Sequence, residues 1–102
     1  MKLLTQEIRR RLPELYATEH HADPIVQAKF FATWSSWTWY PIEFDGEDRF
    51  FGLAVGHVAE LGYFSLQELS AGRGRTQVER DLHFSPRPLS EVRKQHERLT
   101  SE

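Results

Sequence analysis

Three consecutive stretches of alternating side chains constrain the fold of this chain more than any other feature. They cover residues 26–34, 37–44 and 49–57, and they are rich in aromatic and β-branched residues. Only short polar segments separate them: Ser35-Ser36, and residues 45–48 with the sequence Asp-Gly-Glu-Asp. Connections this short join antiparallel neighbours. The sequence therefore predicts an antiparallel β-sheet built from hairpins.

Weaker signals place shorter elements around these strands. Thr5 can cap a helix over residues 5–12 that ends before Pro13, and Ser65 can cap a short helix that ends near Leu69. The other expected elements are a brief strand or turn at 61–64, a strand at 78–84 and a helix at 90–99 capped by Ser90. The sequence thus predicts an α+β fold, with a single antiparallel sheet of four to five strands and short flanking helices at both ends of the chain.

The expected core follows from the alternation along the strands. One face of each strand should be apolar and buried, which selects Phe30, Trp39, Phe51, Leu53, Val55, Leu82 and Phe84. The opposite face of residues 49–57 is unusually small, because it carries Gly52, Ala54 and Gly56 beside Phe50. We expect this small face to lie under a helix or an aromatic ring. Pro41 cannot donate a ladder hydrogen bond, so its strand should lie at an edge, contain a bulge, or turn that position toward solvent.

Length and composition limit the class of protein. A chain of 102 residues with 39% hydrophobic side chains has the size of one domain, so residues 1–102 are expected to fold as a single unit. The absence of cysteine excludes disulfides and thiolate metal sites, and it is consistent with a reducing cytoplasm. No apolar run approaches the roughly 20 residues that a membrane helix needs. We therefore expect a cytoplasmic protein that does not bind membranes.

Neither a metal site nor an enzyme active site is expected. The densest group of ligand-type side chains is His20-His21-Ala22-Asp23, but adjacent histidines in a loop seldom converge on a metal without a distant third ligand. No serine lies in a recognisable nucleophile elbow, and the glycines near Arg73 lack the lysine and length of a phosphate loop. The sequence therefore predicts no cofactor, no metal and no catalytic residue.

The negative charge of the chain is concentrated in its centre. The net charge is −2, but residues 43–68 hold six acidic and one basic side chain. One interpretation is that these acidic residues are solvated turns that keep the protein soluble. The other is a negative surface that binds a basic partner, and it selects five carboxylates as site residues: Glu43, Asp45, Glu47, Asp48 and Glu60.

A second candidate surface combines aromatic and basic residues. Trp34 and Trp37 flank the two-residue turn at Ser35-Ser36, where they could face each other as a cross-strand pair. Arg73 and Arg75 lie in a glycine-containing loop. Since no basic groove is interleaved with the aromatic rings, direct binding of single-stranded nucleic acid is not expected.

A combination of short motifs resembles a known protein family over nearly the whole chain. The motifs are Leu12-Pro13, Leu15-Tyr16-Ala17-Thr18-Glu19, Trp37-Thr38-Trp39-Tyr40, Glu43-Phe44-Asp45-Gly46, Phe51-Gly52, Glu60-Leu61-Gly62-Tyr63-Phe64-Ser65, Glu79-Arg80-Asp81 and Pro88-Leu89. Together they are similar to a small bacterial family of unknown function that is carried on plasmids, conjugative elements and prophages. A member that resembles this chain is described as a type II anti-CRISPR protein.

This resemblance implies a binding protein, not an enzyme. The implied partner is the RNA-guided DNA nuclease of a type II CRISPR system, with or without its guide, and the protein is expected to be a monomer. Such nucleases hold nucleic acids in positively charged channels, so a small protein that presents carboxylates could compete there. The alternative function is an interaction or nucleic-acid-binding accessory module of mobile genetic elements, with contacts through Arg73, Arg75, Arg80 and Arg87.

Overall fold

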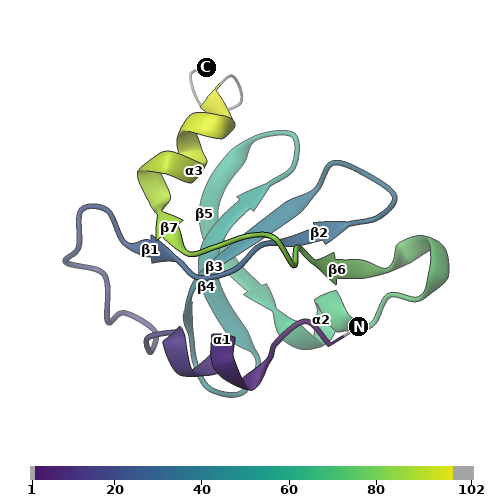
Figure 1. Cartoon of the computed structure of the whole chain (residues 1–102), viewed down its shortest axis with the longest axis horizontal. Helices are drawn as coiled ribbons and strands as arrows, with labels where there is room; N and C mark the ends of the chain where they lie inside the picture. The colour runs from purple at the N-terminus through teal and green to yellow at the C-terminus, as the bar shows by residue number, and fades with distance from the viewer. Residues whose placement is uncertain (1, 98–102) are drawn as a thin grey trace.

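The computed structural model describes residues 2–97 and has an α+β fold with two antiparallel sheets (Figure 1). The large sheet has the strand order β5-β4-β3-β2-β6, and the small sheet pairs β1 with β7. The strands are β1 (Ile25–Val26), β2 (Phe30–Ala32), β3 (Thr38–Phe44), β4 (Arg49–Val55), β5 (Ala59–Ser65), β6 (Val78–Arg80) and β7 (Arg87–Pro88). The helices are α1 (Gln6–Arg11), α2 (Leu66–Ser70) and α3 (Leu89–Gln95), with a 3₁₀ turn η1 (Gly74–Thr76). The predicted fold class is confirmed, and the small sheet is an addition to it.

Local capping signals explain where two of the helices begin. The Thr5 hydroxyl accepts a hydrogen bond from the Ile8 N–H at 3.2 Å, and the Ser65 hydroxyl accepts one from the Glu68 N–H at 3.1 Å. The third expected cap is wrong, because Ser90 lies inside α3 and its N–H and hydroxyl both donate to Asp23. The predicted end of this helix at Leu99 lies outside the described residues.

The expected strands 37–44 and 49–57 are each shorter by one or two residues in the structure, as β3 and β4, and three other expected strands differ more. The predicted strand 26–34 is two strands, because the chain leaves the small sheet after Val26 and joins the large sheet at Phe30. The predicted strand 78–84 stops at Arg80, where Asp81 forms a turn by accepting a hydrogen bond from the His83 N–H. In contrast, the brief element expected at 61–64 is the full strand β5.

The large sheet is buried on both faces, which produces two cores. One core contains side chains from the N-terminal segment, α1 and α2, packed on Phe30, Phe44 and Phe50. The other contains Val26, Leu89 and Val92 from the small sheet and α3, packed on the opposite face. In Figure 1, α1 and α2 accordingly lie at the lower side of the view and α3 at the upper left. The central strands β3 and β4 therefore carry buried residues at successive positions.

The predicted core is correct for Phe30, Leu53 and Val55, which are buried. It is wrong for Leu82, which is 64% exposed because the chain turns away from the sheet after Arg80. The other three predicted core residues, Trp39, Phe51 and Phe84, are only half-buried. The burial of the small face is confirmed at Gly56, where a β-carbon would come within 2.2 Å of the Trp37 ring.

Candidate functional site

The turn between β3 and β4 is held by its own carboxylate. Asp45 Oδ1 accepts hydrogen bonds from the backbone N–H groups of Glu47, Asp48 and Arg49 at 2.8, 2.8 and 3.0 Å. Gly46 adopts a φ of 92°, which other residues rarely tolerate, and its carbonyl accepts a hydrogen bond from Arg9 at 2.8 Å. Asp45 therefore shapes the turn in addition to carrying charge.

Asp48 joins this turn to the start of α2. Its carboxylate accepts hydrogen bonds from the Ser65 hydroxyl and from the Gln67 N–H, both at 2.6 Å. The Asp48 carbonyl also accepts a hydrogen bond from the Leu66 N–H at 2.8 Å. Reversal of Asp48 to lysine would break these contacts, so Asp48 cannot be treated as a free surface charge.

The structure overturns the expectation that Glu43 is a solvated turn residue. Its side chain is only 3% exposed. One carboxylate oxygen accepts the Tyr16 N–H at 2.7 Å, and the other accepts the Thr18 N–H at 2.9 Å as well as the Thr18 hydroxyl. A bulge between Pro41 and Glu43, as expected near Pro41, shifts the register of β3 at this point. Glu43 thus anchors the segment that follows α1 and is withdrawn from the surface.

The five predicted carboxylates do not form one patch. Residues 45–48 lie where β4 begins, whereas Glu60 pairs with Ala54 near the other end of β4. A strand of this length spans roughly 20 Å. Among the residues at the turn, Glu47 is exposed and its side chain makes no hydrogen bond or ion pair within residues 2–97. The predicted acidic surface is therefore divided, and Glu47 and Glu60 are its freely exposed members.

Acid titration should reveal the structural role of Asp45. The backbone N–H of Glu47, followed by that of Asp48, holds the pKa of Asp45 below its ordinary value of 3.8. A carboxyl whose pKa is lowered by folding stabilises the protein above its unfolded-state pKa, and this stabilisation is lost as the pH falls through the folded pKa. We expect Asp45→Asn to have a lower melting temperature than the wild type at pH 7. This gap between the two melting temperatures should close below about pH 4. Glu47→Gln is the matched control and should show no such gap; an Asp45→Asn gap that persists in acid would contradict the assignment.

Most of the arginines expected to contact nucleic acid already donate hydrogen bonds to other groups of this protein. Arg73 donates to the carbonyls of Ser70 and Gly72 at 2.8 and 3.0 Å, and Arg80 donates to the carbonyls of Lys2 and Leu3. Arg87 donates to Ser85 and lies over the Phe84 ring. Arg75 is exposed. This arrangement does not favour a basic groove.

Aromatic side chains gather at the end of the sheet that carries the connection from β2 to β3 and the connection from β4 to β5. Trp34 and Trp37 are 52% and 39% exposed. Trp37 does not pair across the turn with Trp34 as predicted, but stacks on Trp39 with a centroid distance of 6.0 Å and meets the edge of His57 at 6.3 Å. The exposed Val58 follows His57 in the next connection. We call this surface, with the nearby Glu60, the aromatic end; its members are Trp34, Trp37, His57, Val58 and Glu60.

Register places Glu60 on the same face as the tryptophans. Glu60 pairs with Ala54, and Ala54 pairs with Trp39, so these side chains form one row across three strands. Ala54 is small, and Gly56 lies beneath the Trp37 ring. An exposed carboxylate therefore lies on the same face as the two stacked indoles.

Sequence reasoning missed a cavity of about 370 Å³ on the other face of the sheet. Its lining includes Tyr16, Glu43, Phe51, Leu61, Tyr63 and Arg93. Tyr16 has a φ of 71°, and a hydrogen bond between the Tyr16 and Tyr63 side chains raises the pKa of Tyr63 above its ordinary value. Pro13 marks the end of α1 in the sequence, but no local pattern predicts the turn at Tyr16.

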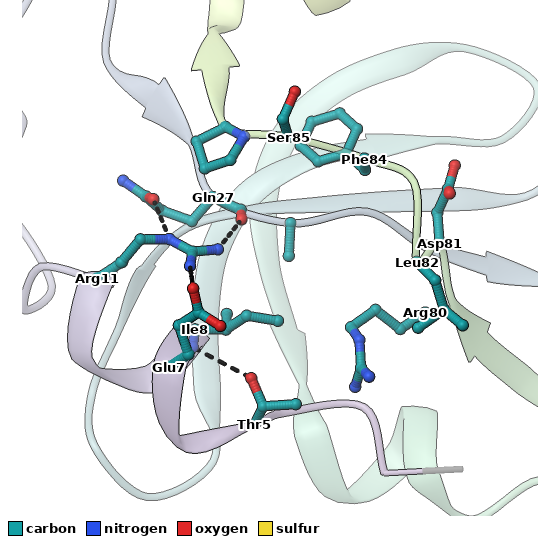
Figure 2. Close-up of a pocket in the computed structure, with 12 residues that line it drawn as sticks. Thr5, Glu7, Ile8, Arg11, Gln27, Arg80, Asp81, Leu82, Phe84 and Ser85 are labelled. Carbon is teal, nitrogen blue, oxygen red and sulfur yellow. Dashed lines mark hydrogen bonds and ion pairs between the residues drawn. The ribbon is translucent and has the colours of Figure 1, made fainter.

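A second cavity, of about 310 Å³, lies between α1 and the segment that follows β6 (Figure 2). Its polar groups largely satisfy one another. Arg11 contacts Glu7 at 3.2 Å and donates to the Gln27 carbonyl and side chain at 3.1 and 3.3 Å (Figure 2). Lys29 lies 3.6 Å from Asp81. We therefore give this cavity no role in binding.

Histidine and carboxylate side chains do not converge on a metal site in the part of the chain that the structure describes. Asp23, the acidic member of the expected cluster, accepts hydrogen bonds from the Ser90 N–H and hydroxyl at 2.8 and 2.6 Å. Within residues 2–97 no helix has the length and apolar character needed to cross a membrane.

The fold and these surfaces define a small α+β protein with an exposed aromatic end on a two-sided antiparallel sheet. Residues 3–99 match the family described as protein of unknown function (DUF2958), and the chain belongs to that family. Comparison with curated proteins finds no match, and neither does comparison with solved structures.

Proposed function

We propose that this chain is a non-enzymatic binding protein that inhibits the RNA-guided DNA nuclease of a type II CRISPR system. The choice of target rests on the resemblance of the sequence motifs to an anti-CRISPR protein. The contact surface is argued from the structure: the aromatic end replaces the acidic turn as the site of binding. The single observation that carries this choice is the exposure of Trp34 and Trp37 on one connection of the sheet.

Exposed tryptophans are suited to anchoring a protein partner. Tryptophan is enriched among the few residues that dominate binding energy at interfaces. Trp37 is held by Trp39 and His57, so little side-chain entropy would be lost when a partner covers it. A pre-formed aromatic surface therefore supports a binding function.

The chemistry of the aromatic end also suits a basic partner. Arginine side chains stack on indole faces and form ion pairs with carboxylates, and Glu60 lies on the same face as Trp37 and Trp39. Nucleases of this class read their short DNA motif with arginines. Occupation of such arginines by the aromatic end would compete with DNA.

The proposal is tested by an inhibition assay with matched variants. We expect Trp34→Ala to weaken inhibition of DNA cleavage on the order of tenfold, as loss of an interface anchor does. Glu60→Lys should weaken it several-fold at low salt and less at high salt, because charge complementarity is screened. Capture of empty and guide-loaded nuclease on the immobilised protein would show which form is bound.

Two controls separate this surface from the rest of the molecule. Leu82→Ala removes an apolar side chain that is more exposed than Trp34, and Glu47→Lys reverses the exposed carboxylate at the far end of β4. Both should inhibit like the wild type. Equal inhibition by Trp34→Ala and wild type would reject the aromatic end as the contact. If neither form of any nuclease in a type II panel is captured, the target itself is wrong, and captured nucleic acid would favour the accessory-module alternative.

A further inference from the structure

Strand β5 forms an open edge of the large sheet. Within residues 2–97 it pairs with β4 alone, and it extends over seven residues, Ala59–Ser65. The opposite edge, β6, has only three residues. Proteins usually protect a long edge strand with proline, several charges or a cover, because its unpaired backbone groups can pair with another strand. β5 contains no proline and a single charge, Glu60.

Two hydrogen bonds show which backbone groups of β5 point outward. At one end the Leu66 N–H donates to the Asp48 carbonyl at 2.8 Å, and at the other the Val58 carbonyl accepts the Gly56 N–H at 2.9 Å. Residues 58 and 66 thus face β4 with their backbone groups, and so do the even-numbered residues between them. The N–H and C=O groups of the odd-numbered residues point away from the sheet; these residues are Ala59, Leu61, Tyr63 and Ser65.

These outward groups match a second copy of the same strand. When two β5 strands run antiparallel about a twofold axis at Gly62, Leu61 lies opposite Tyr63 of the other copy and Ala59 lies opposite Ser65. Each such pair can exchange two hydrogen bonds, but Ser65 is the N-cap of α2 and its carbonyl already accepts the first hydrogen bond of that helix, so roughly six bonds can form across the axis. Every outward-facing residue of the strand then has a partner.

The side chains fit the same register. Leu61 and Tyr63 are 40% and 51% exposed, and in this register they form apolar cross-strand pairs on one face. Glu60 lies opposite Phe64, so the two copies of Glu60 do not face each other. Gly62 lies opposite itself in a pair without hydrogen bonds, where the two backbones approach most closely.

We propose that this chain forms a symmetric dimer in which the two β5 strands pair and the two large sheets become one continuous sheet. This departs from the expected monomer. The self-complementary register selects a second copy as the occupant of the edge, because an arbitrary strand would not pair all four outward residues with compatible side chains. The inference does not depend on the proposed nuclease target, and its test uses this protein alone.

The first measurement is the oligomeric state, by sedimentation velocity from low micromolar to near-millimolar concentration. We expect a concentration-dependent monomer–dimer equilibrium in the wild type. Gly62→Lys should weaken dimerisation at least tenfold, because it places like charges and side chains opposite each other at the axis. A β-carbon at Gly62 meets no atom within 4 Å in the single chain, so the variant should fold. Ser36→Lys adds the same charge in the connection between β2 and β3, away from β5, and should dimerise like the wild type.

The second measurement is amide hydrogen exchange, which reports the geometry of the dimer. The amides of Leu61, Tyr63 and Ser65 should become protected as the concentration rises, whereas those of Glu60, Gly62 and Phe64 should be protected at every concentration by β4. A protein that stays monomeric throughout would overturn the proposal. So would a dimer whose odd-numbered amides exchange as in the monomer, or one that Gly62→Lys leaves intact. Protection that appears only when nuclease is added would identify a different strand as the occupant.

Discussion

Replacement of Glu43 by alanine is expected to lower the free energy of unfolding by about 3–5 kcal/mol, since three donors, two of them buried, lose their acceptor. These donors are the Tyr16 N–H, the Thr18 N–H and the Thr18 hydroxyl. Each is left without a partner in a site that the alanine side chain cannot fill. The same change at Glu47, an exposed residue of the adjacent turn, should alter stability by less than about 0.5 kcal/mol.

Urea unfolding of the two alanine variants measures this difference directly. Amide exchange at Tyr16 and Thr18 should also accelerate in Glu43→Ala, because the loop after α1 loses its anchor. Glu43→Gln should fall between the variants, since its amide can accept at one oxygen but presents N–H groups at the other position. Equal stability of Glu43→Ala and Glu47→Ala would show that the buried network does not hold the loop.

The difference between these two glutamates illustrates why the candidate site could not be read from the sequence. Both lie in the acidic stretch 43–48, and composition treats them alike. Glu43 is buried because the segment with its partners Tyr16 and Thr18 packs against it, although this segment lies more than twenty residues earlier in the chain. No local pattern predicts that contact. Charge counting along the sequence therefore overestimated the acidic surface.

The fold was predictable to the extent that local chemistry determines it. Thr5 and Ser65 cap helices through hydrogen bonds that span three residues, and residues 45–48 form a turn through Asp45 and Gly46. Alternation located the central strands for the same reason, since side chains of neighbouring residues point to opposite faces. These features depend on sequence neighbours alone.

The errors in the fold arise where a long-range contact overrides the local pattern. Residues 26–34 alternate without a break, but the Gln27 N–H donates to the Pro41 carbonyl, and the chain passes from one sheet to the other. Leu82 continues the alternation of β6, yet the turn at Asp81 takes it out of the sheet. β5 was underestimated because only Ala59 of its seven residues is buried and because Gly62 interrupts the alternation, which weakens the periodic signal.

The two phenylalanines of β4 point to opposite faces of the sheet and differ in how deeply they are buried. Alternation favoured Phe51 as a core residue, together with Leu53 and Val55. In the structure Phe50 is completely buried, whereas Phe51 is half-buried beside Tyr63 at a centroid distance of 5.3 Å. Phe51 lines the cavity that Tyr16 and Tyr63 also border.

Phe50→Ala is therefore expected to cost about 3–5 kcal/mol of unfolding free energy, as deletion of a fully buried aromatic ring does. The Phe50 ring stacks on Phe44 at 4.6 Å and on Phe64 at 5.4 Å, and it meets the edge of Phe30 at 5.7 Å, so its loss would leave a cavity bordered by three strands. Phe51→Ala should cost only about 1–2 kcal/mol, because part of its ring is already in contact with solvent. Urea unfolding with an unchanged denaturant slope would measure both values. A larger loss for Phe51→Ala than for Phe50→Ala would contradict the difference in burial between the two rings.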